Sequence, residues 1–133
     1  AHLLQAVYEG VVFSHMTHLN RMRERFTQVQ ALRVTGGPAH SEVWMQMLAD
    51  VSGLRIELPQ VEETGCFGAA LAARVGTGVY RHFREALSSL QHPVRTLLPD
   101  MTAHRLYQRK YRQYQQLISA LQGYHARIKE HTL

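Results

Sequence analysis

Hydrophobic and polar positions along the chain predict helices that alternate with short strands. From His2 to about Phe26, apolar residues recur every three or four positions, which is typical of a long, largely buried helix. The short apolar segment Ala31–Val34 predicts a strand. Helical spacing resumes at Pro38 and ends at Gly53, a residue that suits a helix C-terminus.

A second strand is predicted over Leu54–Leu58, where apolar and charged residues alternate before Pro59. Because a helix separates this segment from the first strand, we expect a parallel pair joined by a right-handed crossover. The stretch 61–75 predicts a helix capped by Thr64, and its many small residues favour close packing against a sheet or another helix.

The remainder of the chain predicts mostly helix. A shorter helix is expected over Val79–Leu90, and a brief strand or extended connector over Val94–Leu98. The last helix begins near Asp100 or Thr102, either of which can cap it. Its aromatic and apolar residues follow a three-and-four spacing and predict a packing face: Tyr107, Tyr111, Tyr114, Leu117, Leu121, Tyr124 and Ile128. The fold class is therefore α/β, predominantly helical, with two or three short strands.

Composition limits the chain to one domain. A length of 133 residues with 45% hydrophobic content is enough for one real core. The chain opens with Ala1 and carries no signal-type segment, so we interpret it as a piece of something longer. No apolar run approaches the length of a membrane span, so we expect no membrane partner. The single cysteine, Cys66, lies among Gly and Ala residues, which predicts a buried thiol in a reducing, cytoplasmic compartment.

The net charge of +5 is concentrated in the last helix. Residues 1–100 carry nine basic and nine acidic side chains, whereas residues 101–133 carry six basic side chains and only Glu130. One interpretation is a non-catalytic module that binds nucleic acid or another acidic partner through Arg105, Arg109, Lys110 and Arg112. We favour the alternative, a solvated side of a packing helix, and predict no nucleic-acid partner.

Other polar residues do not form a catalytic or metal-binding set. His15 and His18 have a spacing that could bind a metal, but no carboxylate on that face completes the ligands. The adjacent Glu62 and Glu63 are expected to point apart. Asp50, late in a helix, and Asp100, at a helix cap, have structural explanations, so we predict no catalytic residue and no metal site in this chain.

The stretch from Val34 to Asp50 carries the strongest functional pattern. It reads as a strand, a turn at Gly36 and Gly37, and a helix from Pro38. Such a turn directs backbone N–H groups and the positive end of a helix dipole at one point, which suits a phosphate or another anion. Ser41, predicted one turn inside the helix, can add a hydroxyl.

The residues of this turn belong to a longer pattern of residues that continues to Tyr80. Its residues are Gly36, Gly37, Ser41, Trp44, Gln46, Ala49, Asp50, Gly53, Pro59, Glu62, Gly65, Gly68, Ala69, Ala70, Ala73, Gly76 and Tyr80. This pattern resembles the carboxy-terminal domain of the FGGY carbohydrate kinases, in the branch of xylulose-type sugar kinases. The resemblance implies the actin-like ATPase (ribonuclease H-like) fold, with residues 1–133 forming part of the nucleotide-side domain and the amino-terminal domain absent.

The resemblance also implies an activity and a site. The family transfers the γ-phosphoryl group of ATP to a sugar hydroxyl, here that of a ketose such as L-xylulose, with Mg²⁺ and with an Asp as base. By carry-over, Gly36, Gly37, Pro38 and Ser41 contact the nucleotide, and Ala39 lines the same turn. Many relatives have a third glycine at position 38, and glycerol kinases have Asn at position 41.

The catalytic Asp, the other phosphate-binding segment and most sugar contacts are expected in the absent domain. This chain would then supply half of an ATP/ADP site and be inactive alone. Because removing the rest of a sheet exposes a strand edge and apolar surface, we also expect the chain to self-associate.

Overall fold

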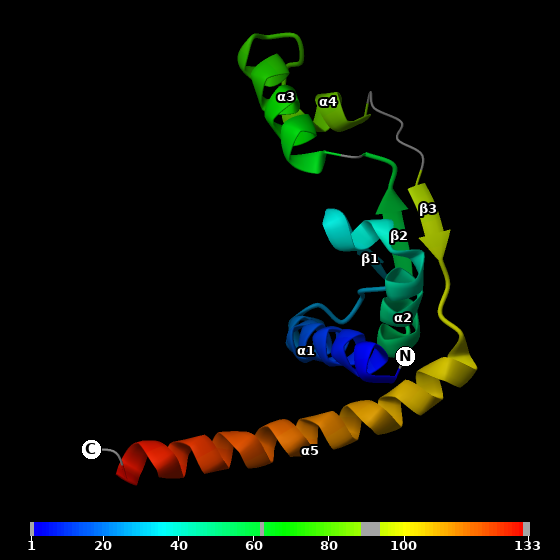
Figure 1. Ribbon diagram of the computed structural model, residues 1–133. Helices are drawn as coiled ribbons and strands as arrows, with labels where there is room; N and C mark the ends of the chain where they lie inside the picture. The colour runs from blue at the N-terminus through cyan, green and yellow to red at the C-terminus, as the bar shows by residue number, and fades with distance from the viewer. Residues whose placement is uncertain (1, 62, 89–93, 132–133) are drawn as a thin grey trace.

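The computed structural model describes residues 2–61, 63–88 and 94–131, with the element order shown in Figure 1. The elements are α1 (His2–Arg25), β1 (Ala31–Arg33), the 3₁₀ helix η1 (Gly37–His40), α2 (Glu42–Ser52), β2 (Arg55–Pro59), α3 (Thr64–Gly76), α4 (Phe83–Ser88), β3 (Val94–Leu97) and α5 (Met101–His131). The predicted helical fold with a small sheet is confirmed.

The sheet has three strands in the order β1, β2, β3. β1 and β2 are parallel, with Ala31 opposite Arg55, which confirms the predicted direction. β3 is antiparallel to β2, with Pro59 opposite Val94, so the segment predicted as a strand or connector is a strand. This arrangement brings the carboxyl ends of β1 and β2 together with the amino end of β3.

α2 is the central helix of the fold. One of its faces packs on the sheet, where Ala49 meets Ile56, and both residues are fully buried. Its other side contributes Val51 to a cluster with Phe13 of α1 and Tyr111 of α5. Burial of these apolar side chains from both sides holds α1, α5 and the sheet on one common element.

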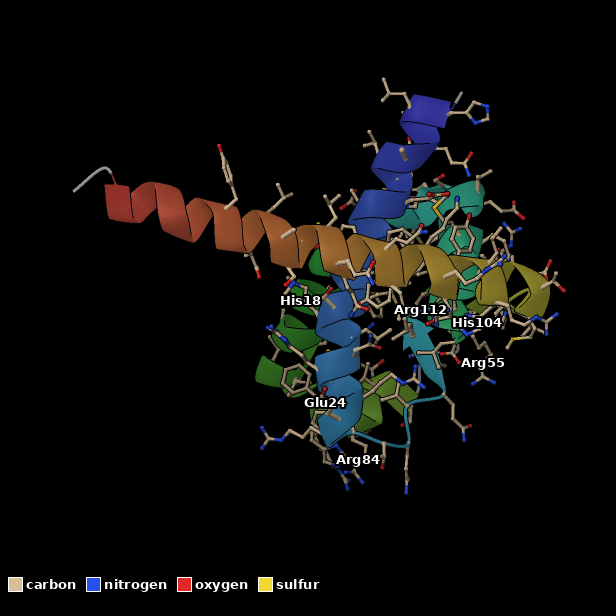
Figure 2. The ribbon with its side chains drawn as sticks, turned by 90° about the horizontal axis from the view of Figure 1, so that it is seen from below. His18, Glu24, Arg55, Arg84, His104 and Arg112 are labelled. Atoms are coloured by element: carbon tan, nitrogen blue, oxygen red, sulfur yellow. The ribbon has the colours of Figure 1, made fainter. Side chains whose placement is uncertain are left out.

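The packing face predicted for α5 is present in the first half of the helix only. The ring centroid of Phe13 lies 6.4, 5.8 and 5.5 Å from the ring centroids of Tyr107, Tyr111 and Tyr114, respectively. Further along, Leu117 and Tyr124 are exposed, at 58% and 56%. Viewed from below, α5 crosses α1 and then projects beyond the other elements (Figure 2). The side chain of Ile128 lies outside the described residues.

α3 and α4 correct two predictions. They pack against each other and lie away from the sheet (Figure 1). Leu71 is the one buried residue of α3, and the small residues expected to pack closely are exposed. Cys66 is likewise exposed, not buried as predicted. The composition of α3 suits close packing, but among the described elements it packs against the short helix α4 and not on the sheet.

Helix boundaries agree with the prediction where they depend on a residue's own backbone conformation or on its hydrogen bonds to nearby backbone groups. Gly53 ends α2 in the left-handed region, with φ +68°. Asp100 caps α5, because its Oδ1 accepts hydrogen bonds from the N–H groups of Thr102 (2.7 Å) and Ala103 (3.3 Å). Thr64 is not a cap: it is already helical, and Glu63 occupies the N-cap without a side-chain hydrogen bond.

The helix predicted over Val79–Leu90 is shorter, because the N–H groups of Val79 and Tyr80 turn back to the carbonyl of Arg74. Residues 89–93, which include the predicted end of this helix, lie outside the described residues, as does Glu62.

Candidate functional site

The glycine turn follows β1 directly. Gly36 has φ +90° and ψ −174°, and its carbonyl accepts a hydrogen bond from Ala39 N–H at 3.0 Å. A positive φ of this size favours glycine. A Cβ atom added at Gly36 or Gly37 would meet nothing within 4 Å. The turn is therefore tightly closed on itself and open on its outer side.

Pro38 stands in the first turn of η1, where its missing N–H costs little. The sequence predicts a single helix from Pro38, and this is wrong: η1 ends at His40 and α2 begins separately at Glu42. No hydrogen bond found in the described part of the chain uses the N–H of Gly37. This donor is free to bind an acceptor from outside.

Ser41 is the N-cap of α2 and does not lie one turn inside the helix. Its Oγ accepts a hydrogen bond from Trp44 N–H at 3.4 Å, and its own N–H donates to Pro38 O at 3.1 Å. The Ser41 hydroxyl can still donate its hydrogen to a ligand. Gly36, Gly37, Pro38 and Ser41 thus lie together between β1 and α2, as the sequence predicts.

A pocket of about 400 Å³ adjoins this turn. Ala39 and His40 of η1 line one side, and Leu58 to Val61, at the carboxyl end of β2, line another. Arg95 of β3 completes the lining and forms an ion pair with Glu42, in the first turn of α2. Hydrogen bonding to Arg95, followed by its positive charge, holds the pKa of Glu42 below the ordinary value.

Arg95 and Glu42 were missed by the sequence reasoning. Arg95 lies 53 positions from Glu42, in a segment that the sequence allows to be a mere connector. The antiparallel register of β3 on β2 brings the two side chains together. No local pattern in the chain signals this contact.

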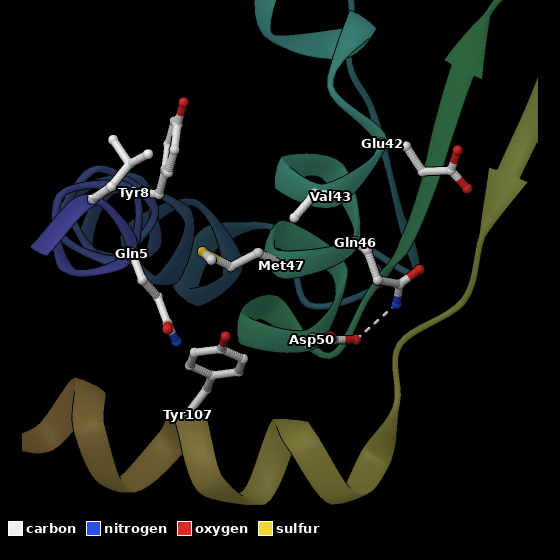
Figure 3. Close-up of a pocket in the computed structure, with 9 residues that line it drawn as sticks. Gln5, Tyr8, Glu42, Val43, Gln46, Met47, Asp50 and Tyr107 are labelled. Atoms are coloured by element: carbon white, nitrogen blue, oxygen red, sulfur yellow. Dashed lines mark hydrogen bonds between the residues drawn. The ribbon is translucent and has the colours of Figure 1, made fainter. Parts of the chain in front are cut away.

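A larger cavity of about 750 Å³ lies between α1, α2 and α5 (Figure 3). Its lining is Leu4, Gln5, Tyr8, Glu42, Val43, Gln46, Met47, Asp50 and Tyr107. Burial, followed by the negative charge of Glu9, raises the pKa of the Tyr107 phenol. The walls are mainly apolar, and the amide and carboxylate groups come from Gln5 on α1 and from α2.

Asp50, at one side of this cavity, is engaged in holding the fold. Its Oδ1 accepts hydrogen bonds from Gln46 Nε2 and from the backbone N–H of Asp100, both at 2.8 Å. Gln46 Nε2 also donates to the carbonyl of Leu98 at 2.9 Å. These bonds join α2 to the segment between β3 and α5.

The basic run of α5 is partly used in packing. Lys110 Nζ lies 2.7 Å from Glu9 Oε1 of α1 and stands over the Tyr107 ring. His15 and His18 are both exposed on α1, and the described residues contain no group of three His, Cys, Asp or Glu side chains that could hold a metal ion. None of the helices described is long and apolar enough to cross a membrane.

Comparison with known families decides which kind of protein this fold and turn represent. Residues 1–77 match the model of the FGGY family of carbohydrate kinases, C-terminal domain. The chain belongs to this FGGY family. The match covers the glycine turn, α2, β2 and α3, as the resemblance in the sequence predicts.

Curated relatives of this FGGY chain include L-xylulose/3-keto-L-gulonate kinase of Escherichia coli K12, which is 86% identical over 133 residues, covering 100% of this chain and 27% of that kinase. The probable L-xylulose kinase of Pasteurella multocida is 53% identical, over 92% of this chain and 24% of its own length. The FGGY chain therefore spans about a quarter of the length of the curated relatives that it matches.

Solved structures confirm the fold. The FGGY chain is similar to the ligand-bound xylulose kinase of Lactobacillus acidophilus, with a TM-score of 0.78 and 22% identity over 90% of this chain and 24% of that one. It is also similar to the xylulose kinase of Rhodospirillum rubrum, with a TM-score of 0.75 and 24% identity over 92% and 25% of the two chains. The predicted actin-like ATPase fold is thereby confirmed.

Proposed function

We propose that this chain is the carboxy-terminal, nucleotide-side part of a two-domain kinase that transfers the γ-phosphoryl group of ATP to a hydroxyl of a ketose such as L-xylulose. The observation that carries the proposal is an open glycine turn in a chain 86% identical to L-xylulose/3-keto-L-gulonate kinase along its whole length. The sugar follows from that relative and from the probable L-xylulose kinase of Pasteurella multocida.

The turn suits the phosphate side of a nucleotide. The Gly37 N–H has no partner among the described residues, and the amino end of α2 adds the positive end of a helix dipole. The absence of a side chain at Gly36 and Gly37 lets a ligand approach the backbone closely. Pro38 and Ala39 follow Gly37 in η1, and the Ser41 hydroxyl is a side-chain donor beside them.

The chemical step requires groups that this chain does not supply. Phosphoryl transfer needs Mg²⁺ to neutralise charge and a base to accept the sugar proton. Asp50 is occupied by Gln46 and by the Asp100 N–H, and Asp100 caps α5. We therefore assign the base, most Mg²⁺ contacts and the sugar contacts to the amino-terminal domain, and this chain alone is inactive.

Substitutions of Gly37 test the proposal in the full-length gene product that contains this chain. A graded series, Gly37→Ala, Gly37→Val and Gly37→Trp, adds volume only outside the turn, because an added Cβ meets no protein atom. We expect the KM for ATP to rise with side-chain size, by about tenfold or more for Gly37→Trp. The unfolding temperature serves as the control and should change little.

An unchanged KM for ATP across the series would contradict the nucleotide assignment. Amide-resolved NMR gives a direct readout: titration with ADP and Mg²⁺ should move the signals of Gly36, Gly37 and Ser41 in a saturable way. Screening ketoses with the same protein then identifies the sugar. We place the kinase in the cytoplasm, a proposal that fractionation of cells tests independently.

A further inference from the structure

The ion pair between Glu42 and Arg95 lies beside the glycine turn, where a charge would affect the binding of a phosphate. Glu42 follows Ser41, the cap residue of the turn, and lies in the first turn of α2. A carboxylate there interacts favourably with the helix dipole. The same negative charge lies within one helical turn of the place where the phosphates of a nucleotide would bind, and like charges repel.

The positive charge of Arg95, on a different element, offsets the negative charge of Glu42. Arg95 reaches from β3, lines the pocket beside η1 and pairs with Glu42. Both side chains remain open to solvent, with 49% of the Arg95 side chain and 62% of the Glu42 side chain exposed. Exposed ion pairs contribute little to stability, so packing gives no strong reason for this contact.

We propose that Arg95 is a positioning residue for nucleotide binding: it neutralises Glu42, and so allows the anionic phosphates to bind at the glycine turn. This inference rests on the proposed function and adds a residue beyond the segment that matches the family model, which ends at residue 77. Arg95 acts through Glu42 and need not touch the nucleotide itself.

The size of the effect follows from electrostatics. A single uncompensated charge roughly 8 Å from two or three phosphate charges, in a screened aqueous setting, changes a binding constant by about two- to fivefold. The effect should be largest at about 0.02 M salt and should nearly vanish at about 0.5 M salt. A loss of packing would not depend on salt in this way.

The test measures the Kd of ADP for four variants of the full-length gene product, at low and at high salt. We expect Arg95→Gln to weaken binding about two- to fivefold at low salt, and Glu42→Gln to bind as well as the wild type or more tightly. The double variant Glu42→Gln, Arg95→Gln should return to near the wild-type value. Arg55→Gln is the matched control, because its side chain is also 49% exposed and lies at the other end of β2.

Two results would overturn the inference. Wild-type affinity in Arg95→Gln at low salt would show that the charge of Glu42 does not matter. An Arg95→Gln defect that persists in the double variant would show a structural role for Arg95 alone. Gly37→Trp in the same assay separates this inference from the proposed function: if it leaves ADP binding unchanged, the nucleotide does not bind at the turn.

Discussion

The carboxylate of Asp50 accepts a hydrogen bond from the backbone N–H of Asp100, with 2.8 Å between Oδ1 and N. The side chain of one acidic residue thereby fixes the residue that caps α5, and the cap's own carboxylate is left to accept from Thr102 and Ala103. Asp50 is 9% exposed, so water is a poor substitute for either partner. The carboxylates of Asp50 and Asp100 therefore have structural roles, one fixing the backbone of the cap residue and the other capping α5.

Removal of the Asp50 carboxylate should destabilise the junction of α2 and α5. Asp50→Ala leaves the Asp100 N–H without an acceptor, and we expect a loss of about 2–3 kcal/mol in the free energy of unfolding. Asp50→Asn keeps one acceptor oxygen and should lose about 1 kcal/mol. Urea denaturation followed by Trp44 fluorescence measures both. Equal losses would show that the hydrogen bond to Asp100 is not the cause.

Gly53 should not tolerate a side chain. It has φ +68°, and an added Cβ would lie 2.7 Å from Cε1 of His104, whose Nδ1 is bonded to Asp50 O at 2.8 Å. We expect Gly53→Ala to cost about 2–3 kcal/mol, part from the backbone conformation and part from the ring contact. The comparison of Gly53→Ala in wild-type and His104→Ala backgrounds separates the two parts. Full stability in Gly53→Ala would contradict the local geometry.

Acid should remove the contribution of the Glu42–Arg95 ion pair to the stability of the fold. Because Arg95 lowers the folded-state pKa of Glu42, the stabilisation is present above the ordinary carboxyl pKa of 4.5 and is lost as pH falls through the lowered value. Unfolding temperatures of wild type and Glu42→Gln should therefore differ slightly at neutral pH, as expected for an exposed pair, and converge once the pH is below the lowered pKa of Glu42. A difference that persists in acid would assign the effect to packing.

Tyr107 should make the chain sensitive to alkali. Its folded-state pKa is raised above 10.0, chiefly by burial, so the stability present below pH 10.0 is lost as pH rises through the raised value. Tyr107→Phe cannot ionise and should lose less stability over the same range. Phenolate absorbance, recorded for both proteins, assigns the titration. Ionisation of Tyr107 together with ordinary exposed tyrosines would contradict the prediction.

The second half of α5 should support self-association. Leu117, Leu121 and Tyr124 form an exposed apolar stripe that continues the packing face of the first half. Leu117→Glu together with Leu121→Glu should shift sedimentation toward the monomer. Gln115→Glu together with Ser119→Glu is the matched control, since it places the same charges on the opposite side of the helix. A monomeric wild type at high concentration would remove the expectation.

Residues that set the local backbone conformation or bond to nearby backbone groups were predictable from the sequence. Gly53 and Asp100 terminate and cap helices through φ and through a carboxylate, and both predictions are confirmed. The parallel direction of β1 and β2 followed from the intervening helix, and the glycine turn from the residues of the turn itself.

Predictions failed where the answer depends on a distant partner. Cys66 and the small residues of α3 are exposed because α4, the element that packs against α3 in the described part of the chain, leaves them uncovered. The Glu42–Arg95 contact depends on the register of β3 on β2, which no neighbouring residue encodes. The break between η1 and α2 at Ser41 was also missed, because Pro38 is equally compatible with an α-helix start.

The separation of α3 and α4 from the sheet implies that this chain need not unfold as one cooperative unit. Trp44, the single tryptophan, packs with the α1, α2 and α5 core, so its fluorescence is insensitive to the pair formed by α3 and α4. Far-ultraviolet circular dichroism counts every helical residue. With few buried contacts of its own, the α3–α4 pair should melt first, and the dichroism transition should begin at a lower denaturant concentration than the fluorescence transition.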